Sequence, residues 1–433
     1  MIGPARSAAV DALALIDGGD LDMGSAIARV RATLKDERDG ALLLELVTGT
    51  LRMRAALDYQ LASRVNRPLG KLDAAVLRVL RMSAFQLLYL SRQPVSAIIN
   101  DAVELTRRSG KSSAAGLTNA VLRSLARDRE SLTWPSRENL SEYLSVVHSH
   151  PLWLVERWIE RYGINETESW LTFNNQPAPL CLAVNRRLLT REALAEELAA
   201  DHVTTRPTGR AAHGLVVIEG RALATRAFRE GRFVVQDEAS QLICELLDVP
   251  VGETVLDLCA SPGGKTLALA AAVGPKGTVV AMDVRPNRVR LLTSTIERCG
   301  LKNVTVVHGP VDEPLPFSPG QFALALIDAP CSGLGTVRRD PDIRWRRSPD
   351  ELGRFAAVQR DLLNRAADLV KPGGALVYST CSSEPEENED VVASFLRDRP
   401  DFKQDSTHQT LPFRDGLEAF YGAILRRTIA ERT

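Results

Sequence analysis

The chain has 433 residues, a formal net charge of zero, and 45% hydrophobic and 25% charged residues. These proportions are typical of globular proteins, so they exclude a chain that is disordered over most of its length. At roughly 100–200 residues per domain, the length predicts two to four domains. No apolar run reaches about 18 residues and no signal-peptide pattern is present, so we expect a cytoplasmic protein with no membrane segment.

The six cysteines are dispersed along the chain, and no two of them form a C-x-x-C pair. Zinc sites are usually built from closely spaced ligand pairs, so this distribution argues against a metal site. In a cytoplasmic protein we expect the thiols to stay reduced.

Residues 1–130 show helical periodicity, which predicts an all-α bundle. In the stretch "LDAAVLRVLRMSAFQLLYL" one face carries apolar residues at helical spacing: Leu72, Val76, Val79, Leu80, Leu87 and Leu90. Residues 131–149 are polar and are predicted to form a linker. Residues 150–235 predict a small α+β module, with helices in "HPLWLVERWIERYG" and "REALAEELAAD" and strands in "LCLAVN" and "GLVVIE".

From residue 236 to 433, short apolar runs alternate with helical stretches. The runs are "TVLDLC" (254–259), "GTVVAMDV" (277–284), "NVTVVHG" (303–309), "FALALID" (322–328) and "GALVYSTC" (374–381). Strands that are buried on both faces read as such continuous apolar runs. The pattern therefore predicts a Rossmann-like α/β domain with a mostly parallel sheet.

The first run of this domain leads into a glycine-containing turn and a helix, "VLDLCASPGGKTLALAAAVG". Gly263 and Gly264 allow a ligand to approach the backbone, and Asp283 ends the next strand, where an acidic side chain can bind ribose hydroxyls. The turn matches neither G-x-G-x-x-G nor the P-loop. S-adenosylmethionine therefore fits better than a dinucleotide or a nucleoside triphosphate, although close helix–strand packing also selects glycine.

Two cysteines follow the ends of predicted strands, Cys331 after "LIDAP" and Cys381 after "LVYST". Ligands of doubly wound sheets bind at the carboxyl ends of the strands, so both thiols and Asp328 are predicted to face one pocket. The alternative is that each cysteine is an inert small hydrophobic residue. We expect that alternative for the other four: Cys181, Cys244, Cys259 and Cys299.

A pair of thiols beside a methyl donor suits methylation of cytosine at C5. A thiolate that adds to C6 makes C5 nucleophilic, and a second group can help to release the adduct. Asp328 near N3 would stabilise the protonated ring. Methylation of ring or exocyclic nitrogens needs no thiol pair, so the two cysteines discriminate between these reactions.

The motifs "DLCASPGGKT", "DAPCSGLGTVRRDPDIRWRRSP" and "YSTCSSEPEENE" closely resemble those of bacterial 16S rRNA cytosine-5 methyltransferases of the RsmB (Sun/Fmu) type. The stretches "ELVTGTLRMRAALDYQL" and "RMSAFQLLYL" resemble the NusB-like RNA-binding domain at the N-terminus of that family. The resemblance covers nearly the whole chain, and the NusB-like domain distinguishes this family from other RNA cytosine-5 methyltransferases.

The resemblance implies a role for individual residues. Cys381 would be the nucleophile, Cys331 would assist proton removal and product release, and Asp328 would lie between cofactor and base. Asp283 would hold the ribose of S-adenosylmethionine, with no metal involved. The methionine part of the cofactor would be wrapped by Cys259, Ala260, Ser261, Pro262, Gly263, Gly264 and Lys265.

One departure from the family pattern follows the third strand. The family often has a Gly-Asp pair there, whose aspartate lies near the adenine, whereas this chain has Pro310 in that place. Either Asp312 substitutes for that aspartate or the contact is lost.

An arginine-rich stretch, "VRRDPDIRWRR", follows the Cys331 turn. Arginine neutralises phosphate and an aromatic ring stacks on bases, so we predict RNA contacts here, although a solvated loop is the alternative. The predicted RNA-binding residues are Arg338, Arg339, Arg344 and Trp345.

The expected partner is 16S rRNA with an unpaired or flipped cytosine, bound by a monomeric enzyme. Two other functions stay open: methylation of a cytosine in another RNA such as tRNA, and a non-catalytic RNA-binding role in ribosome assembly. Retention of Cys331, Cys381, Asp328 and Asp283 argues against the second.

Overall fold

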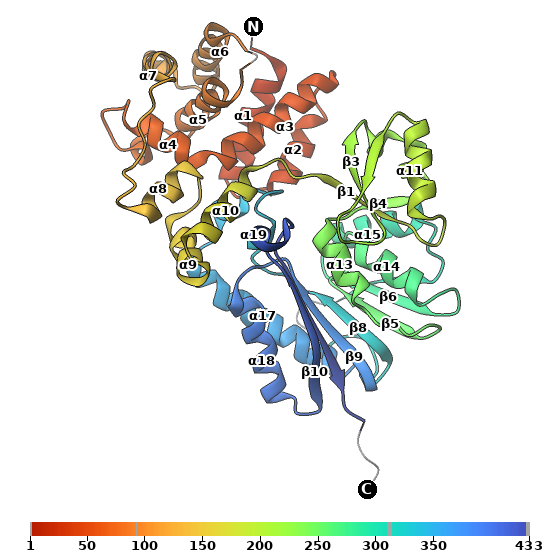
Figure 1. Ribbon diagram of the computed structural model, residues 1–433. Helices are drawn as coiled ribbons and strands as arrows, with labels where there is room; N and C mark the ends of the chain where they lie inside the picture. Colours follow the sequence, from red (N-terminus) through yellow and green to blue (C-terminus); the bar gives the residue numbers. More distant parts are fainter. Residues whose placement is uncertain (1, 92, 310–313, 430–433) are drawn as a thin grey trace. The chain divides into compact units, whose positions relative to one another are not determined.

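The computed structural model describes residues 2–91, 93–309 and 314–429. The chain forms two compact units (Figure 1). The helical unit comprises Met1–Gln176 and Val337–Arg346, and the sheet unit comprises Pro177–Thr336 and Arg347–Thr433. The arginine-rich segment at 337–346 therefore leaves the sheet unit and packs as part of the helical unit.

The helical unit is built around the predicted bundle. Its first seven helices are α1 (Pro4–Asp17), α2 (Met23–Arg31), α3 (Glu37–Arg52), α4 (Arg54–Ala62), α5 (Ala74–Tyr89), α6 (Val95–Arg108) and α7 (Ala115–Asp128), with 3₁₀ turns η1 (Leu69–Lys71) and η2 (Ser112–Ala114). Aspartate side chains cap several helices: Asp22 caps α2, Asp36 caps α3 and Asp73 caps α5. Such caps satisfy the first backbone N–H groups of a helix.

The predicted apolar face of α5 points into the core of the bundle. Val76, Val79, Leu80 and Leu87 are buried in one cluster with side chains of α1, α3, α6 and α7. The two ends of that face, Leu72 and Leu90, pack at its edge and are only partly buried. The helical period of the sequence thus identified the buried stripe.

Four further helices among the described residues complete the helical unit: α8 (Leu140–Val147), α9 (Leu152–Tyr162), α10 (Ile164–Asn175) and α16 (Ile343–Arg346). The predicted helix in "HPLWLVERWIERYG" is confirmed as α9. The ring of Trp158 stacks on that of Trp170 of α10, with centroids 4.2 Å apart. Part of the predicted linker is helical and forms α8. Asn139 caps this helix by accepting a hydrogen bond from the backbone N–H of Glu142.

The sheet unit begins with a small antiparallel sheet of order β2-β3-β1-β4. Its strands are β1 (Leu180–Val184), β2 (Thr204–Pro207), β3 (Gly214–Glu219) and β4 (Phe233–Val235). Between them lie α11 (Arg191–Ala200), η3 (Ala222–Ala224) and α12 (Arg226–Arg229). The predicted strands in "LCLAVN" and "GLVVIE" and the helix in "REALAEELAAD" are confirmed as β1, β3 and α11. Leu194 and Leu198 of α11 are buried with Leu182 and Leu215 of the sheet.

A seven-stranded sheet of order β10-β11-β9-β8-β5-β6-β7 forms the rest of the unit. Its strands are β5 (Thr254–Leu258), β6 (Thr278–Asp283), β7 (Val304–His308), β8 (Phe322–Asp328), β9 (Val370–Thr380), β10 (Phe402–Thr410) and β11 (Phe420–Arg427). The five predicted strands, β5 to β9, are confirmed and run parallel, while β10 and β11 form an antiparallel edge.

Helices cover both faces of this sheet, as the apolar runs of β5, β6 and β8 require. The remaining helical elements are α13 (Glu238–Glu245), α14 (Gly264–Ala272), α15 (Pro286–Arg298), η4 (Leu334–Thr336), α17 (Pro349–Ala367), η5 (Pro385–Glu387), α18 (Glu389–Asp398) and α19 (Pro412–Asp415). Buried apolar side chains of α17 and α18 pack against one face of the sheet, and those of α14 and α15 pack against the other. In the described part of the chain, no helix has the length and apolar character needed to cross a bilayer.

Candidate active site

Two thiols meet at the carboxyl edge of the parallel sheet. β8 and β9 are paired neighbours, with Asp328 opposite Ser379 in the register. Because both strands end there, the turns that follow them lie side by side, and the sulfurs of Cys331 and Cys381 are 3.3 Å apart. Both cysteines are half-buried and neither is in a disulfide.

The hydrogen bond between the sulfurs sets the protonation of Cys331. That contact, together with burial, raises the pKa of the Cys331 thiol well above its ordinary value. Cys331 therefore keeps its proton and can donate it toward the Cys381 sulfur.

An ion pair with a buried lysine and a partly exposed aspartate lies beside the thiols. The Lys265 ammonium, whose side chain is 7% exposed, is 2.8 Å from Asp328 Oδ2, while the Asp328 side chain is 34% exposed. Lys265 also donates to Ser240 Oγ at 3.1 Å and lies 5.7 Å from the ring centroid of Phe420. Burial is the largest single influence and opposes the charge on Lys265, but the charge and hydrogen bond of Asp328, together with the neighbouring sulfurs of Cys244 and Cys381, raise the pKa of the ammonium group overall. Lys265 is therefore a fixed positive charge at this edge.

The turn between β5 and α14 has the backbone that the glycine motif predicts. Gly263 has a φ of +107°, a conformation that residues with a Cβ rarely adopt. Ahead of it, Ser261 N–H donates to Asp283 Oδ2 at 3.3 Å, and Arg285 N–H donates to Asp283 Oδ1 at 3.2 Å. The turn and the end of β6 are therefore tied together around one carboxylate, which is 2% exposed.

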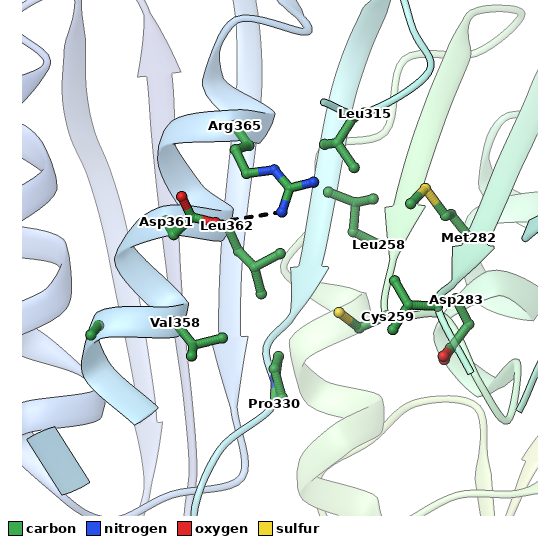
Figure 2. Close-up of a pocket in the computed structure, with 12 residues that line it drawn as sticks. Leu258, Cys259, Met282, Asp283, Leu315, Pro330, Val358, Asp361, Leu362 and Arg365 are labelled. Carbon is green, nitrogen blue, oxygen red and sulfur yellow. Dashed lines mark hydrogen bonds and ion pairs between the residues drawn. The ribbon is translucent and has the colours of Figure 1, made fainter. Parts of the chain in front are cut away.

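A cavity of about 470 Å³ opens beside Asp283. Figure 2 shows the side chains of α17 on one side of it and those of β5 and β6 on the other. Its walls are mainly apolar, and they consist of Leu258, Cys259, Met282, Asp283, Val284, Leu315, Pro330, Ala357, Val358, Asp361, Leu362 and Arg365. Of the predicted cofactor residues, Cys259 and Asp283 line this cavity, whereas the Lys265 ammonium pairs with Asp328 instead.

The Cys259 thiol itself has an inert environment. Burial, with the nearby carboxylates of Asp283 and Asp328, raises its pKa to about 12. A neutral buried thiol is a poor nucleophile. The Cys259 thiol is therefore poorly suited to be a nucleophile. Among the described residues, no cluster of His, Cys, Asp and Glu side chains could hold a metal ion.

Comparison with known proteins assigns a family to each part of the chain. Residues 3–127 match the NusB family, residues 150–223 match the RsmF/B-like ferredoxin-like domain, and residues 244–425 match 16S rRNA methyltransferase RsmB/F. The probable ribosomal RNA small subunit methyltransferase B of Bacillus subtilis is 36% identical over 384 residues, which cover 88% of this chain and 85% of that protein. This chain belongs to the ribosomal RNA small subunit methyltransferase B family.

A further relative and two solved structures are also similar to this chain. The methyltransferase B of Pseudomonas putida is 32% identical over 441 residues, 99% of both chains. The crystal structure of PH0851 is 27% identical, with a TM-score of 0.84 over 99% of both chains. A methyltransferase homologue from Pyrococcus horikoshii is 26% identical, with a TM-score of 0.59 over 67% of this chain and 99% of that one. The family and the three-part fold predicted from the sequence are confirmed.

Arg344 does not lie where the sequence predicted. Arg344 is fully buried in the helical unit. Its Nη1 donates to Ser149 O at 2.9 Å and to Asn175 Oδ1 at 3.2 Å, and lies 3.1 Å from His150 Nδ1. A guanidinium in this position cannot reach phosphate, so the prediction of an RNA contact is corrected for Arg344. The residue fastens the arginine-rich segment inside the helical unit.

The other predicted RNA residues are at least partly accessible. The Trp345 indole donates to Leu51 O at 2.7 Å, and Arg54 lies over its ring at 5.5 Å. Arg338 lies 4.3 Å from the Phe173 ring. Arg338, Arg339 and Trp345 are all half-buried.

Glu387 is a residue of this site that the sequence did not single out. It is fully buried and contacts the turns of both thiols. The signal available was its place in "CSSEPEENE", six residues after Cys381, but five of the seven residues at 384–390 are acidic, a composition that is typical of a solvated surface. Pro310 and Asp312, where the family pattern is broken, lie outside the described residues.

Proposed function

We propose that this protein transfers a methyl group from S-adenosylmethionine to C5 of a specific cytosine in 16S rRNA, through a covalent bond between Cys381 and C6. The observation that carries the proposal is the 3.3 Å contact between the Cys331 and Cys381 sulfurs. These thiols lie beside Asp328, which is still one-third exposed. Methylation at nitrogen or oxygen has no use for such a pair.

The residues around the Asp283 cavity suit S-adenosylmethionine. Its apolar walls match a purine, the Asp283 carboxylate matches ribose hydroxyls, and the cavity is large enough for a nucleoside. In this proposal Asp283 holds the ribose, and Cys259 to Lys265 form the wall toward the methionine part. When bound, the cofactor supplies an electrophilic methyl group.

Cys381 is well placed to be the nucleophile. The Cys331 S–H is a hydrogen-bond donor toward it, and the positive charge of Lys265 acts on the same sulfur. The reaction requires Cys381 as the thiolate. Addition of that thiolate to C6 forms an S–C6 bond and moves the C5–C6 π electrons toward C5.

Asp328 is suited to hold the base during this addition. Its Oδ2 pairs with Lys265 and its Oδ1 accepts from Ser379 Oγ at 3.1 Å. Each carboxylate oxygen has a second lone pair, so Asp328 can still accept a hydrogen bond from a protonated N3. The Lys265 and Ser379 contacts fix the orientation in which it does so.

Release of the product falls to Cys331. Once the Cys381 sulfur is bonded to C6, its contact with Cys331 no longer involves a thiolate. The adduct thus removes one cause of the high pKa of Cys331, its contact with a neighbouring free thiol, and leaves burial as the other. Cys331 can lose its proton to water and take the C5 proton, after which the S–C6 bond breaks and the ring regains its double bond.

On the RNA side, we propose that Arg338, Arg339 and Trp345 contact RNA near the target. They belong to the segment that leaves the Cys331 turn. Arginine and tryptophan side chains bind phosphates and splayed bases. The target cytosine must be unpaired or flipped for C6 to be reached.

Bisulfite mapping of 16S rRNA tests the proposal. RNA from cells with and without the protein should differ at one protected cytosine, and Cys381→Ser should remove the protection. An identical bisulfite map in the two RNAs would contradict the proposal. Protection in tRNA alone would move the reaction to the other substrate.

A further inference from the structure

The two thiol turns share one buried carboxylate. Glu387 Oε2 accepts hydrogen bonds from Ser332 Oγ and from Ser382 Oγ, each at 2.5 Å. Its Oε1 accepts from Ser332 N–H at 2.7 Å and from Gln359 Nε2 at 3.1 Å. Ser332 directly follows Cys331, and Ser382 directly follows Cys381. One carboxylate therefore holds the residue next to each thiol.

The direction of each hydroxyl bond is set by the surrounding backbone. Ser332 Oγ accepts from Leu334 N–H at 3.4 Å, and Ser382 Oγ accepts from Glu384 N–H at 3.1 Å. The two hydroxyls also lie 3.2 Å from each other, but each is closer to Glu387 Oε2, at 2.5 Å, so both hydrogens can point at the carboxylate. With four donors directed at it, the carboxylate is used as an acceptor at both oxygens, which is what an ionised Glu provides.

The position of Glu387 is itself fixed by the fold. It ends η5 and leads into α18. The hydroxyl of Tyr378, on β9, donates to the Glu387 carbonyl. Gln359, on α17, donates to both Pro330 O and Glu387 Oε1. The carboxylate is thus anchored to the strand and the helix that flank the thiols.

We propose that Glu387 is a positioning residue for the methyl-transfer reaction, holding the turns of Cys331 and Cys381 at the spacing that the two thiols need. That the spacing serves methyl transfer rests on the proposed function. The spacing itself is a property of the folded protein and can be measured separately. Glutamine at this position has the same shape and one oxygen acceptor fewer. Its NH₂ group must face either the two serine hydroxyls or the N–H donors of Ser332 and Gln359, so one of these two pairs of donors loses its acceptor and the hold on the two turns weakens.

The spacing can be measured without RNA through oxidation of the thiols. Diamide takes two hydrogen atoms from Cys331 and Cys381, forms the S–S bond and becomes the hydrazine. The rate of this step depends on how often the two sulfurs meet, so loss of the positioning should slow it by about ten-fold. Peptide mapping by mass spectrometry identifies the bridged pair among the six cysteines.

Three substitutions are compared with the native protein in this assay. Glu387→Gln should slow bridging between Cys331 and Cys381, whereas Asp390→Asn, which removes an exposed carboxylate three residues further on, should not. Circular dichroism establishes that the variants are folded. If Glu387→Gln does not fold, Ser382→Ala removes one of the two hydroxyls alone and should slow bridging as well.

The same variants are then assayed for methyl transfer to 16S rRNA. Glu387→Gln should lower kcat by about ten- to a hundred-fold and leave KM for RNA unchanged, because the thiols and not the RNA contacts are displaced. A folding defect alone would lower the active fraction and leave the bridging rate of the folded protein unchanged. Native bridging rates in folded Glu387→Gln and Ser382→Ala proteins would overturn the proposal. Slow bridging in Glu387→Gln, with no 5-methylcytosine made even by the native protein, would overturn the proposed function and leave the positioning intact.

Discussion

Replacing Arg344 by methionine should destabilise the helical unit. The guanidinium is fully buried and donates to Ser149 O at 2.9 Å and Asn175 Oδ1 at 3.2 Å. Leaving a buried acceptor unpaired costs about 1–3 kcal/mol. The substitution leaves two such acceptors unpaired, but methionine fills part of the space and no buried charge is left behind. The free energy of unfolding should therefore fall by about 2–4 kcal/mol.

Tryptophan fluorescence reports on this unit selectively. The chain has five tryptophans, and all lie within Met1–Gln176 or Val337–Arg346: Trp134, Trp153, Trp158, Trp170 and Trp345. Urea unfolding followed by fluorescence should therefore show a lower midpoint for Arg344→Met. The control is Arg346→Met, which removes a guanidinium with a 40% exposed side chain, ion-paired to Asp342, and should cost less than about 1 kcal/mol.

RNA binding, unlike stability, should be unaffected by Arg344→Met. At a temperature where the variant is folded, its affinity for 16S rRNA and the salt dependence of that affinity should match those of the native protein, since no phosphate contact is lost. An unchanged urea midpoint together with weakened RNA binding would refute the reasoning, and would restore Arg344 as an RNA contact.

Three further predictions follow from buried groups. Burial, with the charge of Arg344, lowers the pKa of His150 well below 6.5, so its contribution to stability is complete above that pH and is lost as pH falls below it. His150 should contribute about 1.4 kcal/mol to the loss in the urea assay between pH 7.5 and 5.5, and His150→Gln should lack that part of it, whereas His148, whose pKa burial also lowers, still contributes. Lys265→Met should reduce methyl transfer by about a hundred-fold or more while costing under about 2 kcal/mol, because Asp328 remains partly solvated; near-native turnover would show that the ammonium has no part in the reaction. In Gly309→Ala, the new Cβ would lie 1.6 Å from Met282 Cε and push that side chain into the cavity, so calorimetry should show weaker S-adenosylmethionine binding; native affinity would place the cofactor elsewhere.

The parallel core of the sheet unit could be predicted because its residues are buried on both faces. Strands such as β8 (Phe322–Asp328) leave an unbroken apolar run in the sequence. The edge strand β10 leaves no such trace, since most of Phe402–Thr410 is exposed and polar. Its pairing with β11 is a tertiary property that periodicity does not record.

The site was predictable where backbone and position carry the signal. The glycine turn and the carboxylate of Asp283 depend on local sequence, and the thiols follow from the rule that strand ends meet at one edge. Arg344 and Glu387 show the limit of that reasoning. Each is a charged residue in a charged stretch, which indicates a surface, but tertiary hydrogen bonds bury both side chains completely.

The central claim is that the Cys381 sulfur bonds to the cytosine ring. The most direct test incubates the Cys331→Ser protein with 16S rRNA and S-adenosylmethionine, digests both polymers, and locates the nucleotide on the peptides by mass spectrometry. Because release should be blocked, we expect a methylated cytidine nucleotide attached to the peptide that contains Cys381. A protein that makes 5-methylcytosine while no peptide with Cys381 carries a nucleotide would contradict the account.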